Sequence, residues 1–393
     1  MLQTVEAIEV PPQNAQAVNT FSGVDLALRT SFYKPDHQAI RIVLGTLQAH
    51  YLKIGDPAWL FVIAPPGAGK TTLSIMGACG LPEVTALGDF TEQTFLSGFY
   101  GSKQAGLLEK LGRTVQEGKT YVTEGDAIFL LKDFTTVLSM RREKRGVILS
   151  QLREIHDGMF KRDFGTGETK IWRGRVSIIA AVTPAIDRYN SIFTVLGERF
   201  LKLRWHRPDS EEAGEWAIRQ QGREKEIQGE IKGEVERIFK DASCDPPMLS
   251  GAMTRRIAAL AEIVAIARTH VFRNSYGNRE IEFIPEPEAN TRIAKGLAAI
   301  ARGVASLNRR PQVEEADLQD SFRVGLDCIS EIRRNLVVAA SQNEPIENLR
   351  LARTTREREV EDLSELGVLQ LKNGLQLSDR IQRLLLQSGA RIG

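Results

Sequence analysis

The chain has 393 residues, a length that typically corresponds to two or three domains. Its 42% hydrophobic and 26% charged residues are ordinary for a protein with buried cores, and 52 Lys and Arg against 50 Asp and Glu leave a net charge of +2. This near balance excludes a basic-tail or histone-like binder, although it is compatible with a locally basic groove. The three cysteines lie far apart without a CxxC pair, which argues against a disulfide framework or structural zinc and fits a reducing compartment.

The first half of the chain has the pattern of an α/β unit. Residues 1–25 mix Pro, Gln, Asn and Thr without periodicity and predict a loosely ordered arm, whereas residues 37–54 carry the apolar spacing of a helix. Apolar segments then alternate with helix-like stretches, at residues 60–64, 84–87, 127–131 and 177–182. This alternation predicts a parallel sheet flanked by helices, and the continuously apolar strands predict that both of its faces are covered.

The composition becomes strongly helical after Pro208. Helical patterns occupy residues 211–240, 248–271, 291–306 and 316–336 and predict a separate helical domain. From about residue 343, short helices precede Asn373-Gly374, which between alternating apolar residues is a strong hairpin signal. The sequence therefore predicts an arm at 1–25, an α/β core at 26–207, a helical lid-like domain at 208–342 and a last domain at 343–393.

A glycine-rich segment follows the first predicted strand and opens a predicted helix. Its sequence, Ala64-Pro65-Pro66-Gly67-Ala68-Gly69-Lys70-Thr71-Thr72, matches a phosphate-binding loop except for Ala64 at the first glycine position. Glycines let backbone N–H groups approach phosphates, Lys70 reaches the β- and γ-phosphates, and the Thr71 hydroxyl holds Mg²⁺. We therefore expect ATP and Mg²⁺ as ligands; the expected nucleotide-binding residues are Pro66, Gly67, Ala68, Gly69, Lys70, Thr71 and Thr72. The alternative is a glycine-rich turn with an exposed lysine.

A second metal ligand should lie at the carboxyl end of a neighbouring strand, because ligands of open α/β sheets bind at that edge. Asp133 closes the segment at 128–133 and is so placed, whereas Glu124 and Asp126 precede the strand. We expect Asp133 to hold Mg²⁺ together with Thr71. The alternative for Asp133 is a helix N-cap.

At this point the chain resembles the AAA+ ATPases, over roughly residues 25–341. The resemblance implies a P-loop AAA+ parallel-sheet core with a helical lid, and assembly into a ring or filament in which each subunit completes its neighbour's site. It further implies that Thr183 in Ala-Ala-Val-Thr-Pro is the sensor 1 residue, that Arg199 in Gly-Glu-Arg-Phe is the arginine finger, and that Arg255 is the sensor 2 arginine, with Arg256 as a substitute. These three act beside Lys70 and Asp133 in the expected catalytic set. The alternative for each arginine is a surface ion pair.

One position departs from the family pattern. Most AAA+ ATPases place Glu after the metal-binding Asp to polarise the attacking water, and here that position is Phe134. Either another acid serves or hydrolysis is slow. The candidate acids are Asp89 and Glu92 and, more weakly, Glu143 and Glu154.

Residues 158–173 predict a hairpin inserted just before the strand at 177–182. Aromatic and basic residues flank a Gly-Thr-Gly turn there. Such a hairpin resembles the AAA+ branch that contains minichromosome maintenance helicases, branch-migration motors and sigma-factor activators. In this interpretation Lys161, Arg162, Lys170 and Arg173 neutralise DNA phosphates, and Phe160, Phe164 or Trp172 stack on bases. The alternative is a structural hairpin with the aromatic residues packed inward.

The last domain resembles a winged helix, with a short helix at 348–353, a recognition helix at 355–366 and a wing at Lys372-Asn373-Gly374. Val360, Leu363 and Leu366 would face its core. The DNA-contact candidates here are Arg353, Arg356, Arg358 and Lys372. Because winged helices also bind proteins and four acidic residues dilute the positive charge, a protein contact remains the alternative.

These patterns favour a DNA-acting ATPase that works as a ring-forming motor, helicase-like translocase or remodeller. Phe134 instead favours slow hydrolysis. One alternative is therefore a slowly hydrolysing ATP-dependent switch or loader that assembles on DNA or a protein partner. Another is a protein remodeller that grips its target with the aromatic segment at 95–100. We expect a homo-oligomeric ring, of which a hexamer is one form, in the cytoplasm and without membrane contact, since no signal peptide or long apolar run is visible. His156 and His206 are expected to be structural.

Overall fold

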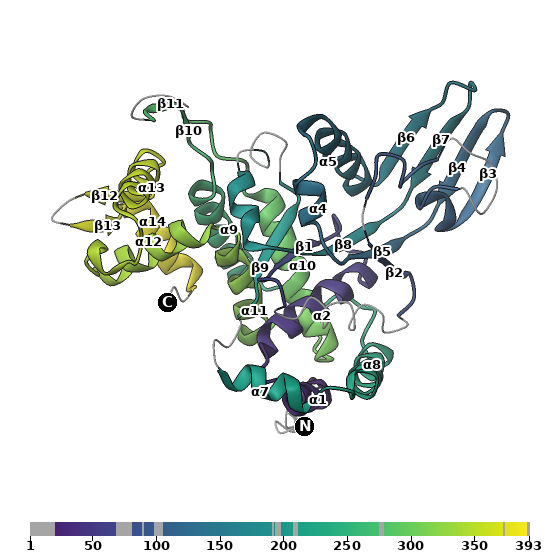
Figure 1. The fold of residues 1–393 in the computed structure, drawn as a ribbon, viewed down its shortest axis with the longest axis horizontal. Coiled ribbons are helices and arrows are strands. Elements are labelled where there is room, and N and C mark those ends of the chain that lie inside the picture. The colour runs from purple at the N-terminus through teal and green to yellow at the C-terminus, as the bar shows by residue number, and fades with distance from the viewer. Residues whose placement is uncertain are drawn as a thin grey trace, which may run out of the picture.

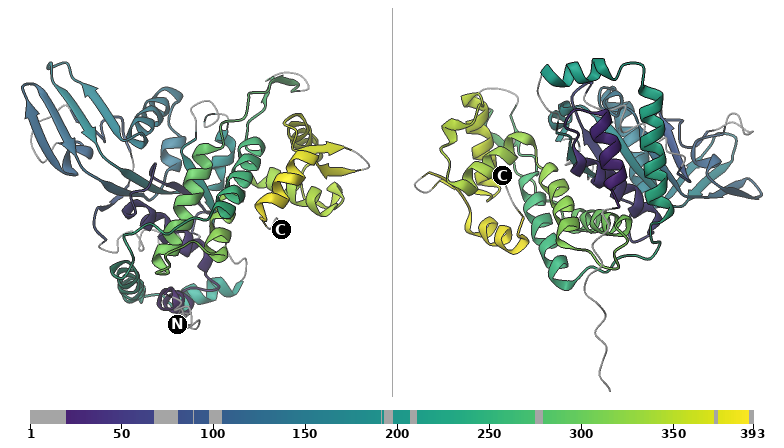
Figure 2. Two further views of the ribbon diagram at one scale, coloured as in Figure 1. Left: turned by 180° about the vertical axis from the view of Figure 1, so that it is seen from behind. Right: turned by 90° about the horizontal axis from the view of Figure 1, so that it is seen from below.

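The computed structural model describes residues 20–67, 81–88, 90–97, 105–190, 192, 198–206, 211–274, 279–371 and 374–390. It contains an α/β body, a projecting four-stranded sheet and a C-terminal unit (Figure 1). The projecting sheet and the C-terminal unit lie at opposite ends of the molecule, as two views from opposite sides show (Figure 2).

A five-stranded parallel sheet forms the centre of the body. Its strand order is β2-β5-β8-β1-β9. The strands are β1 (Trp59–Ile63), β2 (Val84–Leu87), β5 (Ala127–Leu131), β8 (Val176–Val182) and β9 (Phe200–Arg204). The four strands predicted from the sequence are confirmed within one residue at each end, and β9 is an additional strand.

Helices cover both faces of this sheet, because its buried strands alternate their side chains between two apolar cores. Leu60 and Val62 of β1 face a core that includes α2 (His37–Tyr51) and α10 (Thr291–Leu307). Trp59, Phe61 and Ile63 face the other core, which includes α4 (Thr135–Leu138) and α5 (Arg142–His156). The short 3-10 helices η1 (Leu108–Lys110) and η2 (Pro184–Tyr189) connect the strands.

Two hairpins build the projecting sheet, whose strand order is β3-β4-β7-β6. Its strands are β3 (Arg113–Glu117), β4 (Thr120–Glu124), β6 (Met159–Asp163) and β7 (Thr169–Arg173). The hairpin β6–β7, predicted from the sequence, is confirmed just before β8. The hairpin β3–β4 precedes β5 in the same way and was not predicted, and the two pair through parallel β4 and β7. We call this sheet the arm (Figure 1).

The helices after residue 208 share a core with the sheet instead of forming one of their own. They are α7 (Glu211–Arg219), α8 (Glu224–Lys240), α9 (Gly251–Ala267), α10, α11 (Glu315–Asp327) and α12 (Glu331–Gln342). A single apolar cluster joins Leu60 and Leu201 of the sheet to Leu260, Leu297 and Phe322 of these helices. The expected stretch 316–336 is two helices, and the segment predicted as a loose arm contains the start of α1 (Ser22–Ser31), which packs on α8.

The C-terminal unit contains a helix, a hairpin and a final helix. They are the 3-10 helix η3 (Ile346–Asn348), α13 (Arg353–Glu365), β12 (Leu369–Leu371), β13 (Leu375–Leu377) and α14 (Asp379–Ser388). The hairpin around Gly374 is confirmed, and Val360 and Leu363 are buried as predicted. The helix expected at 348–353 is wrong, since η3 ends at Asn348 and α13 begins at Arg353. A further small hairpin, β10 (Phe272–Arg273) with β11 (Ile281–Phe283), lies between α9 and α10.

Among the described residues, no helix is both long and apolar enough to cross a membrane. Cys244 is exposed and Cys328 is buried, and both are free thiols. The same residues contain no cluster of three or more His, Cys, Asp or Glu side chains suited to a metal ion.

Candidate functional site

The carboxyl edge of the central sheet carries the start of the predicted phosphate loop. The backbone N–H of Ala64 donates to the Val182 carbonyl (3.0 Å), so the loop leaves β1 directly beside the end of β8. Gly67 has a positive φ of 81° with open space around its Cβ position, a conformation that suits glycine and lets a ligand approach the backbone. The remaining predicted contacts, Ala68, Gly69, Lys70, Thr71 and Thr72, lie outside the described residues.

Asp133 and Thr183 are brought together at this edge through Thr135. The Asp133 carboxylate accepts the Thr135 N–H (3.0 Å), and the Thr135 hydroxyl accepts the Thr183 N–H (3.2 Å). The two threonine hydroxyl oxygens are 3.5 Å apart. Because β8 separates β5 from β1, Asp133 lies about 10 Å across the sheet from the end of β1, and Thr183 follows the strand between them. A carboxylate and hydroxyls are oxygen ligands of the kind that Mg²⁺ takes, and here they share the sheet edge from which the loop leaves.

The alternative predicted from the sequence, a helix N-cap at Asp133, is only approached: the N-cap residue of α4 is Phe134, and Asp133, one residue earlier, accepts the N–H of Thr135, the first residue of α4. A carboxylate at the start of a helix and a metal-binding carboxylate at a strand end are therefore both compatible with the geometry.

Phe134 belongs to the apolar core. It is fully buried and packs against Phe61 and Phe200 with ring centroids 4.9 and 5.6 Å away. Of the acids considered as replacements for the missing glutamate, Glu92 is half-buried, Glu143 and Glu154 are exposed, and Asp89 lies outside the described residues.

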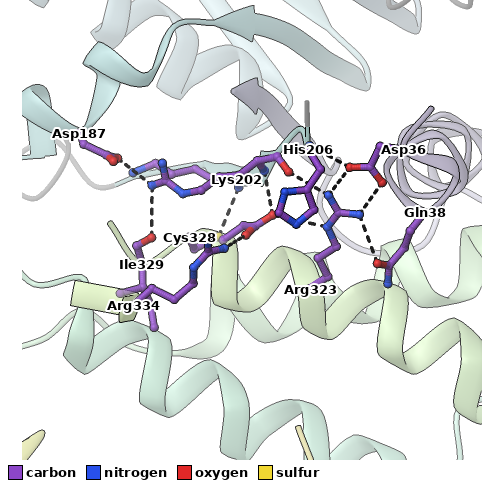
Figure 3. A network of polar contacts seen from close by, with 11 residues as sticks. Asp36, Gln38, Asp187, Lys202, His206, Arg323, Cys328, Ile329 and Arg334 are labelled. Carbon is purple, nitrogen blue, oxygen red and sulfur yellow. Dashed lines mark hydrogen bonds and ion pairs between the residues drawn. The ribbon is translucent and has the colours of Figure 1, made fainter. Parts of the chain in front are cut away.

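A charged network borders the same edge of the sheet beyond β9 (Figure 3). Arg323 of α11 donates to both oxygens of Asp36, the N-cap residue of α2, at 2.5 and 2.7 Å. Asp36 also accepts the His206 N–H (2.9 Å), and Arg204 at the end of β9 pairs with Asp187 of η2 (2.9 Å). The charge of Arg323 overcomes the effect of burial and lowers the pKa of Asp36. The network therefore ties α2, β9, η2 and α11 together next to the loop.

Arg199 lies at the opposite edge. It precedes β9, whose first residue, Phe200, is in register with Trp59, the first residue of β1. Five residues of strand separate this position from the phosphate loop, a distance of about 16 Å along the sheet. Arg199 pairs with Asp157 (3.4 Å), and burial followed by the charge of Arg292 lowers the pKa of Arg199.

Further cations surround Arg199. Arg292, in the first turn of α10, lines one shallow hollow with Arg199, Arg268 and Lys295. His156 lines the same hollow, where burial lowers the pKa of its ring and Trp59 contacts it edge-on; this agrees with the structural role expected for it. Two carboxylates line the same hollow, Asp56, which pairs with Lys295 (3.1 Å), and Glu198, so the hollow holds both signs of charge and lies remote from the chain's own phosphate loop.

Arg255 is exposed in the second turn of α9. Its proposed substitute, Arg256, instead holds the C-terminal unit, since its guanidinium donates to Glu315 (2.6 and 2.9 Å) and to the Ser388 carbonyl (2.7 Å). The geometry therefore disfavours Arg256 as a nucleotide sensor.

The four cations predicted on the arm divide into two pairs. Lys161 and Arg173 are exposed on one face of the arm, whereas Arg162 and Lys170 belong to the other face with buried Phe160 and Trp172. Lys170 is buried and its ammonium donates to the Ser97 carbonyl and to Glu109, each at 2.6 Å. Arg162 donates to the carbonyls of Glu92 (3.1 Å) and Leu96 (3.3 Å).

The expectation that Lys170 contacts phosphates and that Phe160 and Trp172 stack on bases is therefore wrong. The face that carries these aromatic side chains packs against the protein, so the cations on the same face are buried with them. Buried cations require hydrogen-bond or ion-pair partners within the protein. Phe95, the start of the segment considered as a protein grip, is also buried, against Phe90 and Phe160.

In the C-terminal unit the predicted cations differ in exposure. Arg353 is exposed and pairs with Glu357 (2.7 Å), whereas Arg356 and Arg358 are half-buried, and Arg356 donates to the Ile346 carbonyl (3.3 Å). Lys372 lies outside the described residues. Asp362, expected to dilute surface charge, is buried between Arg273 and Arg333.

Three features of the site escaped sequence reasoning: Thr135, the pair Asp36–Arg323, and Arg292. Each depends on contacts between segments far apart in the chain, for which one sequence gives no signal. No family model matches the chain, and no curated protein matches it.

Proposed function

We propose that this protein is an ATPase of the AAA+ type that works as a ring on DNA. ATP and Mg²⁺ bind at the carboxyl edge of the central sheet, with the loop at 64–72 around the phosphates and Asp133 toward the metal ion. Bound Mg²⁺ neutralises charge that develops on the phosphates during hydrolysis. Thr135 orients the Asp133 carboxylate through its backbone N–H, and its hydroxyl holds the backbone N–H of Thr183 at the end of β8.

The main support for this proposal is that the candidate nucleotide site and Arg199 lie at opposite ends of the strands of the central sheet. Asp133, Thr183 and the loop share one edge of the sheet, while Arg199 lies about 16 Å away at the other. An arginine so placed can stabilise a transferring phosphate only on a neighbouring subunit. Head-to-tail contacts of that kind close into rings when the rotation between neighbours closes, and otherwise extend into filaments. Arg292 adds a second cation to the surface that meets the neighbour.

The arm supports the DNA part of the proposal. Lys161 and Arg173 are exposed on its outer face, and the tips of its two hairpins adjoin, since the Thr169 N–H donates to the Lys119 carbonyl (3.0 Å). Exposed cations on a projecting element can contact phosphates of either strand without reading sequence. Arg353 of the C-terminal unit offers a further contact.

A slowly hydrolysing switch or loader is the second candidate. Burial of Phe134 favours it, because no carboxylate directly follows Asp133. Such a protein would bind ATP, assemble on DNA or a protein and turn over slowly.

Mixing two inactive variants tests the proposal. Lys70→Ala removes the phosphate contact but keeps Arg199, and Arg199→Ala does the reverse. Each variant alone should be inactive, whereas an exchanged equal mixture should regain about a quarter of wild-type ATP hydrolysis, since one interface in four pairs an intact loop with an intact arginine. A mixture as inactive as its components would contradict a site shared between subunits.

A further inference from the structure

A buried chain of charges lies directly behind Arg199. Glu198, the residue before it, pairs with Lys202 of β9 (3.1 Å) and with Arg268 (3.4 Å), the C-cap residue of α9. Arg268 also donates to Glu288 (2.6 Å), and Glu288 lies 3.9 Å from Arg292 in the first turn of α10. The chain Glu198–Arg268–Glu288 therefore runs from Arg199 to Arg292.

Because these charged groups are buried, each depends on its partners for compensation of its charge. The side chains of Glu198 and Arg268 are each 7% exposed. Burial alone would lower the pKa of Arg268, but the charges of Glu198 and Glu288 outweigh it and raise that pKa. Removing either partner would leave a charge inside the protein without compensation, so each holds the other in place.

The fork of the Arg268 guanidinium is suited to this position. It faces a carboxylate at each side, one on the segment that leads into β9 and one on the segment that leads into α10. A lysine ammonium keeps the charge but lacks the planar fork that holds two carboxylates in fixed directions.

We propose that Arg268 and Glu198 are positioning residues, which hold Arg199 and Arg292 in the geometry that a neighbouring subunit's nucleotide requires. This inference rests on the proposed function. Arg268 contacts neither nucleotide nor metal in its own subunit; it fixes the backbone before Arg199 and the carboxylate beside Arg292. A displacement of about 1 Å in a group that acts on a transferring phosphate lowers turnover by up to about a hundredfold.

Arg268→Lys is the first test variant. A cavity of about 200 Å³ beside Glu198, Lys202, Arg268 and Glu288 gives the smaller side chain and water room. We expect full-length Arg268→Lys to bind a fluorescent ATP analogue with an affinity within about twofold of wild type and to hydrolyse ATP about ten- to a hundredfold more slowly. The matched control is Arg310→Lys. Arg310 lies between α10 and α11 and pairs with buried Asp317 of α11 (2.8 Å), and its variant should retain turnover.

Mixing separates positioning from a general structural role. Mixed with Lys70→Ala, which supplies an intact Arg199, Arg268→Lys should recover to about a quarter of wild-type hydrolysis. Mixed with Arg199→Ala it should recover nothing, because both proteins then lack a working arginine. The opposite result, recovery with Arg199→Ala only, would assign Arg268 to its own subunit's site and overturn the proposal.

Thermal unfolding accompanies each assay. If Arg268→Lys does not fold, Glu198→Gln replaces it in the same mixtures with the same expectations, and failure of both to fold would overturn the proposal in favour of a folding role. If Lys70→Ala and Arg199→Ala fail to complement each other, the proposed function itself is wrong. That outcome is independent of Arg268.

Discussion

His50 shows how a single buried side chain sets a response to pH. Its ring is fully buried, with Nδ1 3.0 Å from the Ser177 hydroxyl and Nε2 3.2 Å from Glu83. Both contacts suit a neutral ring that accepts at Nδ1 and donates at Nε2. Burial, followed by the charge of Arg175, lowers the pKa of His50 to about 4.

The pKa of His50 is lower in the folded than in the unfolded chain, so its contribution to stability is present above about pH 6.5 and is lost as the pH falls toward 4. Between pH 7.5 and pH 5 this group should lower the free energy of unfolding by about 2 kcal/mol. Urea unfolding of wild type and His50→Gln at both pH values measures the difference. Equal pH dependence in the two proteins would contradict a buried neutral ring.

A second single residue, Asp362 of α13, connects the C-terminal unit to the rest of the protein. Its carboxylate accepts from Arg273 (2.6 Å) and Arg333 (2.9 Å), and Arg333 also donates to the Thr269 carbonyl at the end of α9. Asp362→Ala removes the buried carboxylate that the two guanidinium groups share, while Arg273 keeps Glu361 and Arg333 keeps Glu359. The loss of these charged hydrogen bonds should lower the free energy of unfolding by about 2 kcal/mol. Exposed Glu361, which pairs with the same Arg273, is the matched control, and Glu361→Ala should cost less than about 1 kcal/mol. Chemical denaturation compares them, and similar losses would argue against burial as the cause.

At this scale the sequence correctly predicted that Asp133, Thr183 and the start of the loop lie at the carboxyl edge of the sheet, because strand ends are local signals. It misjudged Lys170 because charge suggested exposure, although its register with Arg162 places it on the same face as Phe160 and Trp172. Applying the two-residue period of a strand to residues 159–173 would have separated Lys161 and Arg173 from Arg162 and Lys170.

At the scale of elements, α2 and α10 cross at a pair of glycines. A Cβ on Gly303 would lie 1.9 Å from the Gly45 carbonyl oxygen, and one on Gly45 would lie 2.4 Å from a methyl of Val304. The helices can approach this closely only because neither residue has a side chain. This contact joins α10, one of the helices after residue 208, to α2, which packs on the sheet.

Gly303→Ala should therefore force α2 and α10 apart and lower the free energy of unfolding by about 1–3 kcal/mol. Gly233→Ala in α8 is the matched control, since nothing lies within 4 Å of its Cβ position, and it should stabilise by about 0.5–1 kcal/mol. Urea unfolding midpoints should move in opposite directions. A neutral Gly303→Ala protein would show that the crossing adapts without cost.

Strands with continuous apolar runs could be predicted from the sequence, but β9 could not. It alternates Leu201 and Leu203 with Lys202 and Arg204, a pattern typical of a half-exposed strand. Both charged residues are buried, because Lys202 pairs with Glu198 and Arg204 with Asp187. The order of the strands, which places β8 between β1 and β5, also depends on long-range packing that one sequence does not encode locally.

At the scale of the whole molecule, the arm and the C-terminal unit extend in opposite directions from the α/β body (Figure 2). If the arm contacts DNA, its exposed cations should contribute to the salt dependence of binding. Replacing Lys161 and Arg173 by Gln should weaken binding and lower the slope of log affinity against log salt by about 1 for each cation. Arg309→Gln, which removes an exposed cation paired with Asp241, is the control, and an equal change in both proteins would argue against the arm.

Steady-state ATP hydrolysis with and without single- and double-stranded DNA tests the central claim most directly, with Lys70→Ala as the blank. We expect turnover that DNA stimulates and that Lys70→Ala abolishes. Binding of ATP with negligible turnover on every DNA would contradict a motor and favour the switch. Hydrolysis that persists in Lys70→Ala would contradict the nucleotide site itself.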